Sequence, residues 1–419
     1  YNKQKKEKKD LYAMIKDRLN SIGIDEFRTD AMNIELLDLN KERSKPKKIQ
    51  RADLKITSLL IDENSGSDST RFLYAKDISL NIPDFNTELD DAPYKFRFKS
   101  LKFSSKEQLT EISGLSLQPT LNLQAFAKQD KLNKARVSLH FDSVNIIGIN
   151  PQKLVSENIF QADSAYISKG ILDLSKDKRY QKENVSKIGD SPAQKLMKIG
   201  FRFSISNIET RGIDLSYAQI SEKFSKEGKI EFKNIYGTLK NVSNDTARLQ
   251  DDPNMTADLT GMIYGKGRLS AKFSFDMLSQ TGNYSYKGAL SPMGVTPYNR
   301  ILEPLLNIRL TQGNIEKINF DMQGNDNKNW GKFTFDYNHL KVEVLKNPDS
   351  GPGKKGILTF ITNKFFINDS NPDANGKYHE AQVDYQRDPH HPFFKVVWKS
   401  LLQGIIECTG TDPKYLPGI

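Results

Sequence analysis

The sequence predicts a mainly β protein: an elongated, curved antiparallel sheet that forms an open groove, with amphipathic helices at its ends. Apolar and polar residues alternate over much of the chain, and alternate residues of a strand point to opposite faces of a sheet. About eighteen stretches have this period of two, whereas only two or three have helical spacing. The hydrophobic content of 37% is low, which indicates a thin architecture with much exposed surface.

The first predicted segment, residues 1–30, contains an amphipathic helix. A charged stretch, Lys3–Asp10, precedes apolar residues at helical spacing, and Gly23 ends the pattern. Such a helix suits a segment that leaves a membrane anchor, and it equally suits a helix packed on the end of a sheet.

The second segment, residues 31–245, is predicted to be a repetitive β part of the groove. Strands alternate through several short apolar runs, and the apolar phase changes between Ile56 and Leu59. A one-residue change of phase predicts a β-bulge, which bends and twists a strand. The polar stretch Lys176–Ala193 is predicted to be a long loop.

The third segment, residues 246–419, is predicted to be a β region that ends in a helix. It contains the clearest alternation, from Gly267 to Val344, which the short helical stretch Pro297–Glu303 interrupts. The side chains that share one face there are the candidate wall of a lipid-binding groove: Leu269, Phe273, Phe275, Met277, Ile318, Phe320, Met322, Phe333 and Phe335.

The last helix is predicted to span about 17 residues after Pro392. Its apolar residues at helical spacing are Phe394, Val397, Trp398, Leu401, Ile405 and Cys408. Lys395, Lys399 and Gln403 fall elsewhere around this helix. We expect it to plug or extend one end of the groove.

The sequence contains no recognisable catalytic constellation, so the protein is predicted not to be an enzyme and to need no cofactor. It has no nucleophile elbow, no Walker motif and no H-E-x-x-H. His390 and His391 follow Asp388, but adjacent residues in a Pro-flanked turn seldom share a metal, and we predict no metal site. The single cysteine, Cys408, excludes an intrachain disulfide.

The net charge of +10 has more than one interpretation. Lysines on a surface improve solubility and block exposed sheet edges, and they also attract anionic lipid headgroups. Basic residues are scattered instead of interleaved with aromatic residues, so nucleic acid is not a predicted partner. The chain contains no run of 18 apolar residues, hence no predicted transmembrane helix.

Residues Met255–Thr409 resemble the AsmA-like family of envelope proteins, in particular its Bacteroidetes versions. The resemblance rests on the alternation from Leu269 to Met277, on several short sequence motifs and on the terminal helix with Gly404. The motifs are Thr296-Pro-Tyr-Asn-Arg-Ile-Leu-Glu-Pro304 and Asn307-Ile-Arg-Leu-Thr-Gln-Gly313, with Phe320-Asp-Met-Gln-Gly324 and Tyr337–Leu345 after them. The first 240 residues share with the family only the general succession of strands and loops.

The resemblance implies a periplasmic protein, anchored to the inner membrane by an N-terminal helix that this chain does not contain. It implies lipid transfer, in which a hydrophobic groove carries the acyl chains of a phospholipid or another envelope lipid toward the outer membrane. The alternative is a structural or assembly subunit of an envelope complex, whose sheet is covered by partner proteins. The apolar face is also compatible with half of an ordinary closed core.

Overall fold

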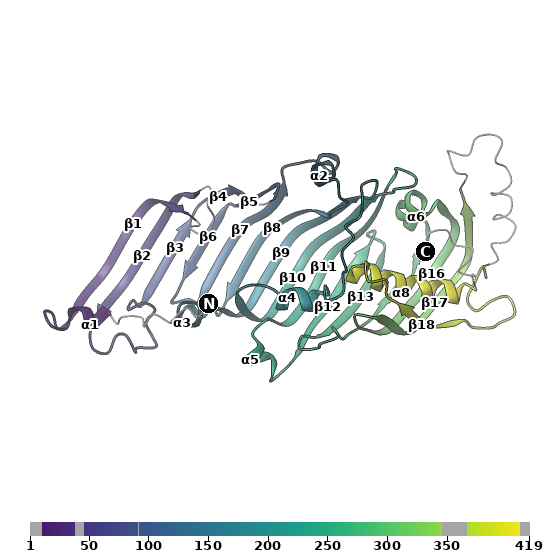
Figure 1. Ribbon diagram of the computed structural model, residues 1–419. Helices are drawn as coiled ribbons and strands as arrows, with labels where there is room; N and C mark the ends of the chain where they lie inside the picture. Colours follow the sequence, from purple (N-terminus) through teal and green to yellow (C-terminus); the bar gives the residue numbers. More distant parts are fainter. Residues whose placement is uncertain (1–10, 38–45, 91, 346–366, 411–419) are drawn as a thin grey trace. The chain divides into compact units, whose positions relative to one another are not determined.

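The computed structural model describes residues 11–37, 46–90, 92–345 and 367–410 of the 419-residue chain. Strands account for 55% of the residues and helices for 15%. The eighteen strands of this described part belong to one open, predominantly antiparallel sheet (Figure 1). This confirms the predicted fold class of a mainly β protein with an open sheet.

The elements follow the chain in this order: α1 (Leu11–Ile15), β1 (Ile22–Leu36), β2 (Lys47–Ile61), β3 (Asp77–Ile82), β4 (Phe85–Glu88), β5 (Tyr94–Phe98), β6 (Ser100–Ser104), β7 (Leu109–Pro119), α2 (Leu123–Asp130), β8 (Arg136–Ile147), α3 (Pro151–Glu157), β9 (Ile159–Asp177), α4 (Pro192–Met197), β10 (Arg202–Ile220), β11 (Glu227–Ser243), α5 (Thr246–Leu249), β12 (Asn254–Ile263), β13 (Gly267–Asp276), β14 (Tyr284–Leu290), β15 (Met293–Gly294), the 3-10 helix η1 (Thr296–Tyr298), α6 (Asn299–Leu306), β16 (Ile308–Gly324), β17 (Lys328–Val344), β18 (Glu380–Gln386) and α8 (Phe393–Cys408). Helices are therefore more numerous than the sequence predicts, although most are short.

The chain forms two compact units. Unit 1 comprises Tyr1–Leu117, Phe141–Ile167 and Phe201–Ile205, and unit 2 comprises Gln118–His140, Ser168–Gly200 and Ser206–Ile419. The predicted boundary between residues 245 and 246 does not coincide with this division. Strands β11 and β12, which flank that position, pair directly with each other within unit 2.

In unit 1, the helix that was predicted to continue to Gly23 is wrong beyond Ile15. Helix α1 ends at Ile15, and Ile22 begins β1, which pairs with β2 from Ile22–Ile61 onward. Residues 1–10, the charged stretch included, lie outside the described residues. The strand conformation is favoured here because its backbone N–H and C=O groups form hydrogen bonds with a neighbouring strand. An isolated helix shorter than about 12 residues is only marginally stable.

The predicted change of phase in β2 falls at an unusual backbone position. Ser58, between Ile56 and Leu59, has a left-handed backbone with φ of 49°. The register shifts between β1 and β2 lie elsewhere, on either side of Met32. The alternation of apolar residues thus predicts the position of the irregular backbone at Ser58, but it does not predict the register shifts near Met32.

Unit 2 contains an antiparallel ladder in which β11, β12, β13, β14, β16, β17 and β18 pair in succession, and β15 pairs with β16. Paired residues point to the same face, so the register builds continuous rows across the strands. One row is Ala257–Phe273–Tyr286–Met322–Gly331–Val383. The next is Leu259–Ala271–Gly288–Phe320–Phe333–Ala381.

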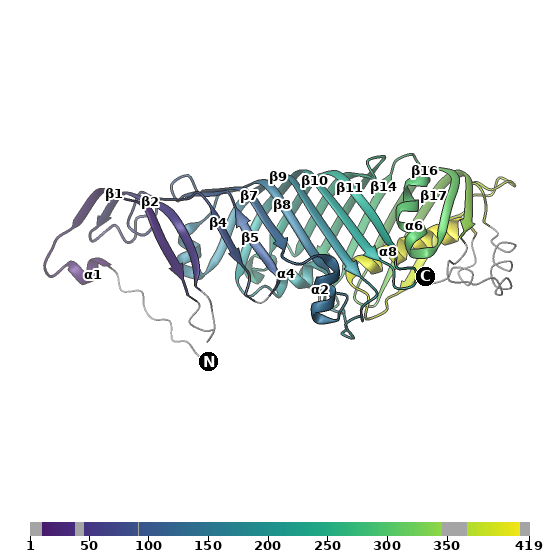
Figure 2. The ribbon, with the colours of Figure 1, turned by 90° about the horizontal axis from the view of Figure 1, so that it is seen from above.

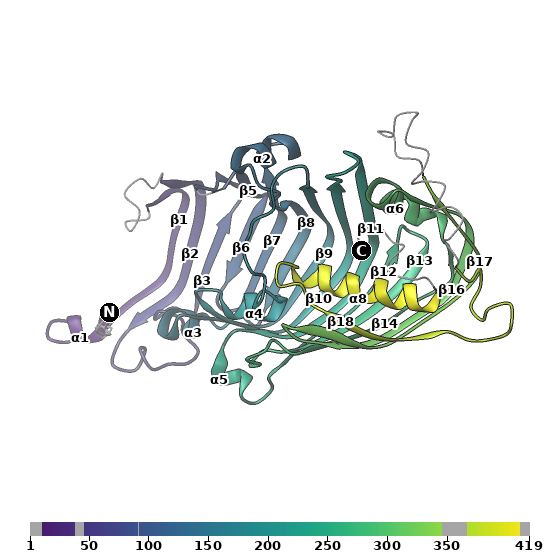
Figure 3. The ribbon, with the colours of Figure 1, turned by 45° about the vertical axis from the view of Figure 1, so that its right-hand side comes forward.

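Helix α8 lies on the apolar face of this ladder and contacts β17 and β18 (Figures 1 and 3). Viewed from above, the yellow helix is on one side of the green strands (Figure 2). Helix α6 contacts β11 and β16 of the same unit. The interrupting helix predicted over Pro297–Glu303 is therefore present, as η1 followed by α6.

Strands β9 and β10 run parallel where both belong to unit 2. The Ser216 hydroxyl donates to Asp173, and the Lys178 amide donates to the Ile220 carbonyl at 3.1 Å, so residue numbers rise together on the two strands. A parallel pair needs a crossover connection. That connection is the predicted polar loop, which ends in α4.

Gly404 of α8 has a steric role that a substitution tests. A Cβ at this position would overlap the ring of Phe333, so we expect Gly404→Ala to lower the free energy of unfolding by about 1–3 kcal/mol, the usual range for overpacking. Chemical denaturation measures this change. Gly200→Ala is the control because a Cβ there has no heavy atom within 4 Å; an equal loss in both variants would contradict the assigned role.

Candidate functional site

The predicted groove wall lies in the interior of unit 2. Seven of its nine residues are buried: Phe275, Met277, Ile318, Phe320, Met322, Phe333 and Phe335. Leu269 and Phe273 are half-buried. The register does bring the nine together on one face of β13, β16 and β17, with Met277 just beyond β13. They do not, however, line an open surface.

Helix α8 covers this face. The ring of Phe393 lies 4.8 Å from that of Tyr284, 5.6 Å from Phe275 and 6.5 Å from Phe273, measured between ring centroids. At the other end of the helix, the buried Cys408 Sγ lies 3.8 Å from the Phe333 carbonyl oxygen. The predicted groove wall in this region is therefore packed beneath α8, and its role in lipid binding stays a prediction.

A polar network is enclosed in the same core. The Tyr284 hydroxyl donates to Asn329 Oδ1, and Asn329 Nδ2 donates to the Tyr286 hydroxyl at 3.0 Å. Asn329 is completely buried. Burial raises the pKa of Tyr286 to about 12, so its proton is retained at neutral pH. This network fixes side-chain positions beneath α8, and its polar groups are hydrogen-bonded to one another.

A buried ion pair joins three parts of unit 2. Arg387 Nη1, just after β18, lies 3.1 Å from Asp326 Oδ1 in the turn between β16 and β17. Asp326 also accepts hydrogen bonds from the Gly189 amide and the Gln194 side chain, both in the crossover after β9. The carboxylate thus connects the crossover to the hairpin and to the segment that leads into α8.

The outer side of α8 differs from the prediction. Residues Phe393, Val396, Val397, Ser400 and Gly404 face the core. Phe394 is 69% exposed and Trp398 is 38% exposed, although the sequence placed both on the packed face. At the same spacing follow Leu401 and Ile405, which are half-buried. We name Phe394, Trp398, Leu401 and Ile405 the α8 outer stripe.

A second apolar surface lies in unit 1. Phe27 pairs with Ile56 and Ile56 with Ile78, while Leu54 pairs with Leu80 and Leu80 with Phe103. These six residues, Phe27, Leu54, Ile56, Ile78, Leu80 and Phe103, form what we name the unit 1 apolar strip. Phe27 is 47% exposed and the others are half-buried. None of the six appears among the predicted site residues, although the alternation in their strands was visible.

The two faces of this part of unit 1 differ sharply in polarity. On the reverse face, Arg28 pairs with Lys55, and Asn81 pairs with Lys102. Beside the strip, Ala52, Ile82 and Phe98 form a small buried core, against which Phe85 and Phe96 of the β4–β5 hairpin and Leu80 of the strip itself pack. The strip is the part of the apolar face that remains accessible beyond this core.

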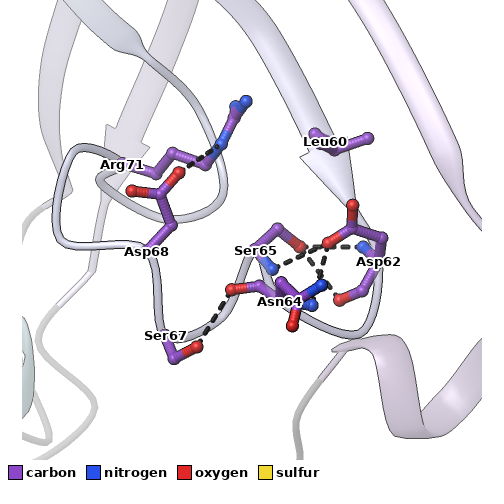
Figure 4. Close-up of a pocket in the computed structure, with 7 residues that line it drawn as sticks. All are labelled: Leu60, Asp62, Asn64, Ser65, Ser67, Asp68 and Arg71. Atoms are coloured by element: carbon purple, nitrogen blue, oxygen red, sulfur yellow. Dashed lines mark hydrogen bonds and ion pairs between the residues drawn. The ribbon is translucent and has the colours of Figure 1, made fainter.

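A loop pocket of about 420 Å³ in unit 1 lies between Leu60 and Arg71 (Figure 4). Its polar groups satisfy one another: the Ser65 amide donates to Asp62 Oδ1 at 2.7 Å, and Arg71 Nε lies 3.2 Å from Asp68 Oδ2. The hydrogen bond from the Ser65 amide lowers the pKa of Asp62, and hydrogen bonds from the Thr70 hydroxyl and amide lower the pKa of Asp68, with a smaller contribution from Arg71. The arrangement explains the loop conformation and leaves no group oriented for chemistry.

The sequence-level candidates for metal binding are engaged in local contacts. His390 Nδ1 and His391 Nε2 each lie 3.1 Å from a carboxylate oxygen of Asp388. Burial raises the pKa of Cys408 to about 11, which keeps its thiol protonated. In the described ranges, no group of three or more histidine, cysteine or acidic residues is placed to hold a metal ion.

No protein-family model matches the chain, and no curated protein matches it either. No helix within the described ranges is both long and apolar enough to span a membrane. The resemblance of Met255–Thr409 to AsmA-like proteins therefore stays a prediction.

The Asp326–Arg387 pair gives a prediction for stability. Asp326→Asn leaves the guanidinium of Arg387, whose side chain is 1% exposed, without its counter-charge; we expect a loss of about 3–5 kcal/mol, as for other broken buried pairs. Urea denaturation measures it. Asp384→Asn is the control because its partner Lys328 and Asp384 itself are exposed, and such pairs contribute about 0–1 kcal/mol. Similar losses in the two variants would refute the role of the buried pair.

Proposed function

We propose that the protein binds the acyl chains of envelope lipids on the apolar side of its sheet and transfers them between the inner and outer membranes. The observation that carries this proposal is the unit 1 apolar strip, which is accessible on one face of a sheet whose reverse face is charged. A hydrocarbon chain on such a strip leaves water, at about 0.8 kcal/mol per buried methylene.

The dimensions of the strip suit a chain more than a compact ligand. Its two rows cross neighbouring strands, which lie about 4.8 Å apart in any sheet. A flexible alkyl chain laid across the strands contacts one side chain per strand and needs no polar partner. The described hydrogen-bonding side chains on its two rows are Thr29 and Thr110, which pair with Leu54 and Phe103, and Ser105, whose buried hydroxyl accepts from the Ile78 amide.

The resemblance to AsmA-like proteins supports the cellular location proposed for this activity. It favours a periplasmic location and an inner-membrane anchor that precedes the residues of this chain. The alternative, an assembly subunit whose strip is covered by partner proteins of the envelope, predicts a different occupant for the same surface. Protein side chains would then replace the lipid.

We predict that Leu80→Asp or Phe27→Asp abolishes lipid retention. A carboxylate on the strip is incompatible with a hydrocarbon neighbour because its desolvation is unfavourable. Protein prepared without detergent is extracted with organic solvent, and mass spectrometry quantifies bound lipid per chain. Ser79→Asp is the matched control, since Ser79 precedes Leu80 and lies on the reverse face opposite Lys55. Circular dichroism checks that each variant keeps its sheet.

Transfer is measured separately with fluorescent phospholipid moving from donor to acceptor vesicles. Wild type and Ser79→Asp are expected to accelerate transfer, and Leu80→Asp is not. Wild-type protein that neither carries lipid nor accelerates transfer would refute the proposal. A stoichiometric complex with another envelope protein through the strip, in place of lipid, would favour the assembly role.

A further inference from the structure

Four lysines gather in unit 2 between the end of β9 and α8. Lys176 and Lys178 are two residues apart and continue the face on which Leu172 and Leu174 lie. Lys395 and Lys399 are four residues apart, hence on one side of α8. All four are half-buried. We name Lys176, Lys178, Lys395 and Lys399 the lysine cluster.

The cluster lacks direct counter-charges. Within the described part of the chain, none of its four lysines forms an ion pair with a carboxylate. Lys395 Nζ instead lies 2.7 Å from His391 Nε2. The nearby carboxylates have other partners: Asp177 is paired with Arg179 at 2.7 Å, and Asp388 contacts His390 and His391. Glu183, Glu222 and Asp388 attenuate the positive charge without pairing directly with a cluster lysine, so cations remain in excess here.

The electrostatic effects agree with this geometry. Burial lowers the pKa of Lys178, and the charges of Lys176 and Lys399 lower it further. Burial lowers the pKa of Lys395 to about 8, again with contributions from Lys178 and Lys399. These effects accompany a direct contact between the two segments: the Lys187 amide, in the crossover after β9, donates to the Pro389 carbonyl, just before α8, at 2.7 Å. An anion between them would relieve the repulsion.

The α8 outer stripe lies beside the cluster on the same helix. Phe394 precedes Lys395, and Trp398 precedes Lys399, so an exposed apolar row runs next to a cationic row. A free inorganic anion would use only the lysines. A ligand with a phosphate and an attached hydrocarbon chain would use both rows, and this combination is the chemistry of a phospholipid.

We propose that the lysine cluster binds the phosphate of an anionic phospholipid headgroup and that the α8 outer stripe contacts an acyl chain of the same molecule. This inference rests on the proposed function and specifies its ligand class. A headgroup with net negative charge is favoured over a zwitterionic one because a choline cation would add to the excess positive charge. Phosphatidylglycerol is therefore preferred to phosphatidylcholine.

The first test measures headgroup preference. Acyl-labelled phosphatidylglycerol and phosphatidylcholine are titrated into the full chain, and fluorescence gives the dissociation constants. We expect wild type to prefer phosphatidylglycerol by about tenfold or more, as charge-assisted contacts to phosphate are the strong ones. Replacing all four lysines by glutamine should remove this preference, because the charge that distinguishes the two headgroups is then absent and their dissociation constants converge.

The matched control removes two lysines from the other face of unit 2. Lys272 and Lys287 are exposed and pair directly across β13 and β14. Like the cluster, they are neighbouring cations, but they have no apolar stripe beside them. Lys272→Gln with Lys287→Gln should keep the wild-type preference.

A second measurement separates a binding role from a structural one. Because the cluster lysines repel one another, Lys178→Gln with Lys399→Gln should raise the thermal unfolding midpoint of the lipid-free protein while it weakens phosphatidylglycerol binding by about tenfold. Lysines that only support the fold would lower the midpoint instead. A lowered midpoint with unchanged binding would overturn the proposal.

The pH dependence follows from Lys395, which faces Lys178, Lys182, Lys399, His391 and Asp388. As a base with a depressed pKa of about 8, it loses its charge as pH rises through 8, well before an ordinary lysine. Phosphatidylglycerol affinity should therefore fall between pH 7 and pH 9, and Lys395→Gln should flatten this dependence. Affinity that is constant over this range in wild type would contradict a contribution from Lys395 to headgroup binding.

The outcomes distinguish this inference from the proposed function. Equal binding of both lipids by wild type, or an unchanged preference in the four-lysine variant, would overturn the headgroup site and leave lipid binding intact. Failure of wild type to bind either lipid would overturn both. Inorganic phosphate that binds as tightly as phosphatidylglycerol would show that the cluster serves a free anion and would also overturn the proposal.

Discussion

The structure depends on one constraint: paired residues in an antiparallel ladder point to the same face, so a period of two in each strand creates rows that cross the whole ladder. In unit 2 those rows hold aromatic rings from β13, β14, β16 and β17 side by side. A single layer cannot bury this face against itself. Helix α8 provides the cover, and its fit depends on the absence of a side chain at Gly404, where Phe333 enters.

The alternation in the sequence was sufficient to predict this ladder and the common face of Leu269, Phe275, Phe320 and Phe333. It could not reveal whether the face is open, because periodicity reports which side chains share a side and says nothing about what lies opposite. The sequence pattern also could not predict which side of α8 packs on the sheet. The helix has apolar residues on two sides, and only the shape of the sheet selects the side with Val396 and Gly404. The helix that was predicted to continue to Gly23 ends early, at Ile15, for a related reason, since pairing of β1 with β2 overrides a weak local pattern.

The two apolar surfaces that stay accessible arise differently. The unit 1 apolar strip remains because the β4–β5 hairpin covers only the neighbouring small core. The α8 outer stripe remains because the helix itself is the cover, and Phe394 and Trp398 stay 69% and 38% exposed on its outer side. In both places a charged surface accompanies the apolar one: the reverse face of the sheet in unit 1, and the lysine cluster in unit 2. An amphipathic ligand can contact both the apolar and the charged surface of such a pair, whereas a purely apolar ligand can contact only the apolar one.

The position of α8 in the chain has a consequence for biosynthesis. The helix follows every strand that it covers, so the ribosome completes β13 to β18 before their cover exists. During that interval the rings of Phe275, Tyr284 and Phe333 are presented on a growing sheet, a state prone to association with other chains. The nascent protein would thus depend on chaperones most strongly just before its last helix emerges.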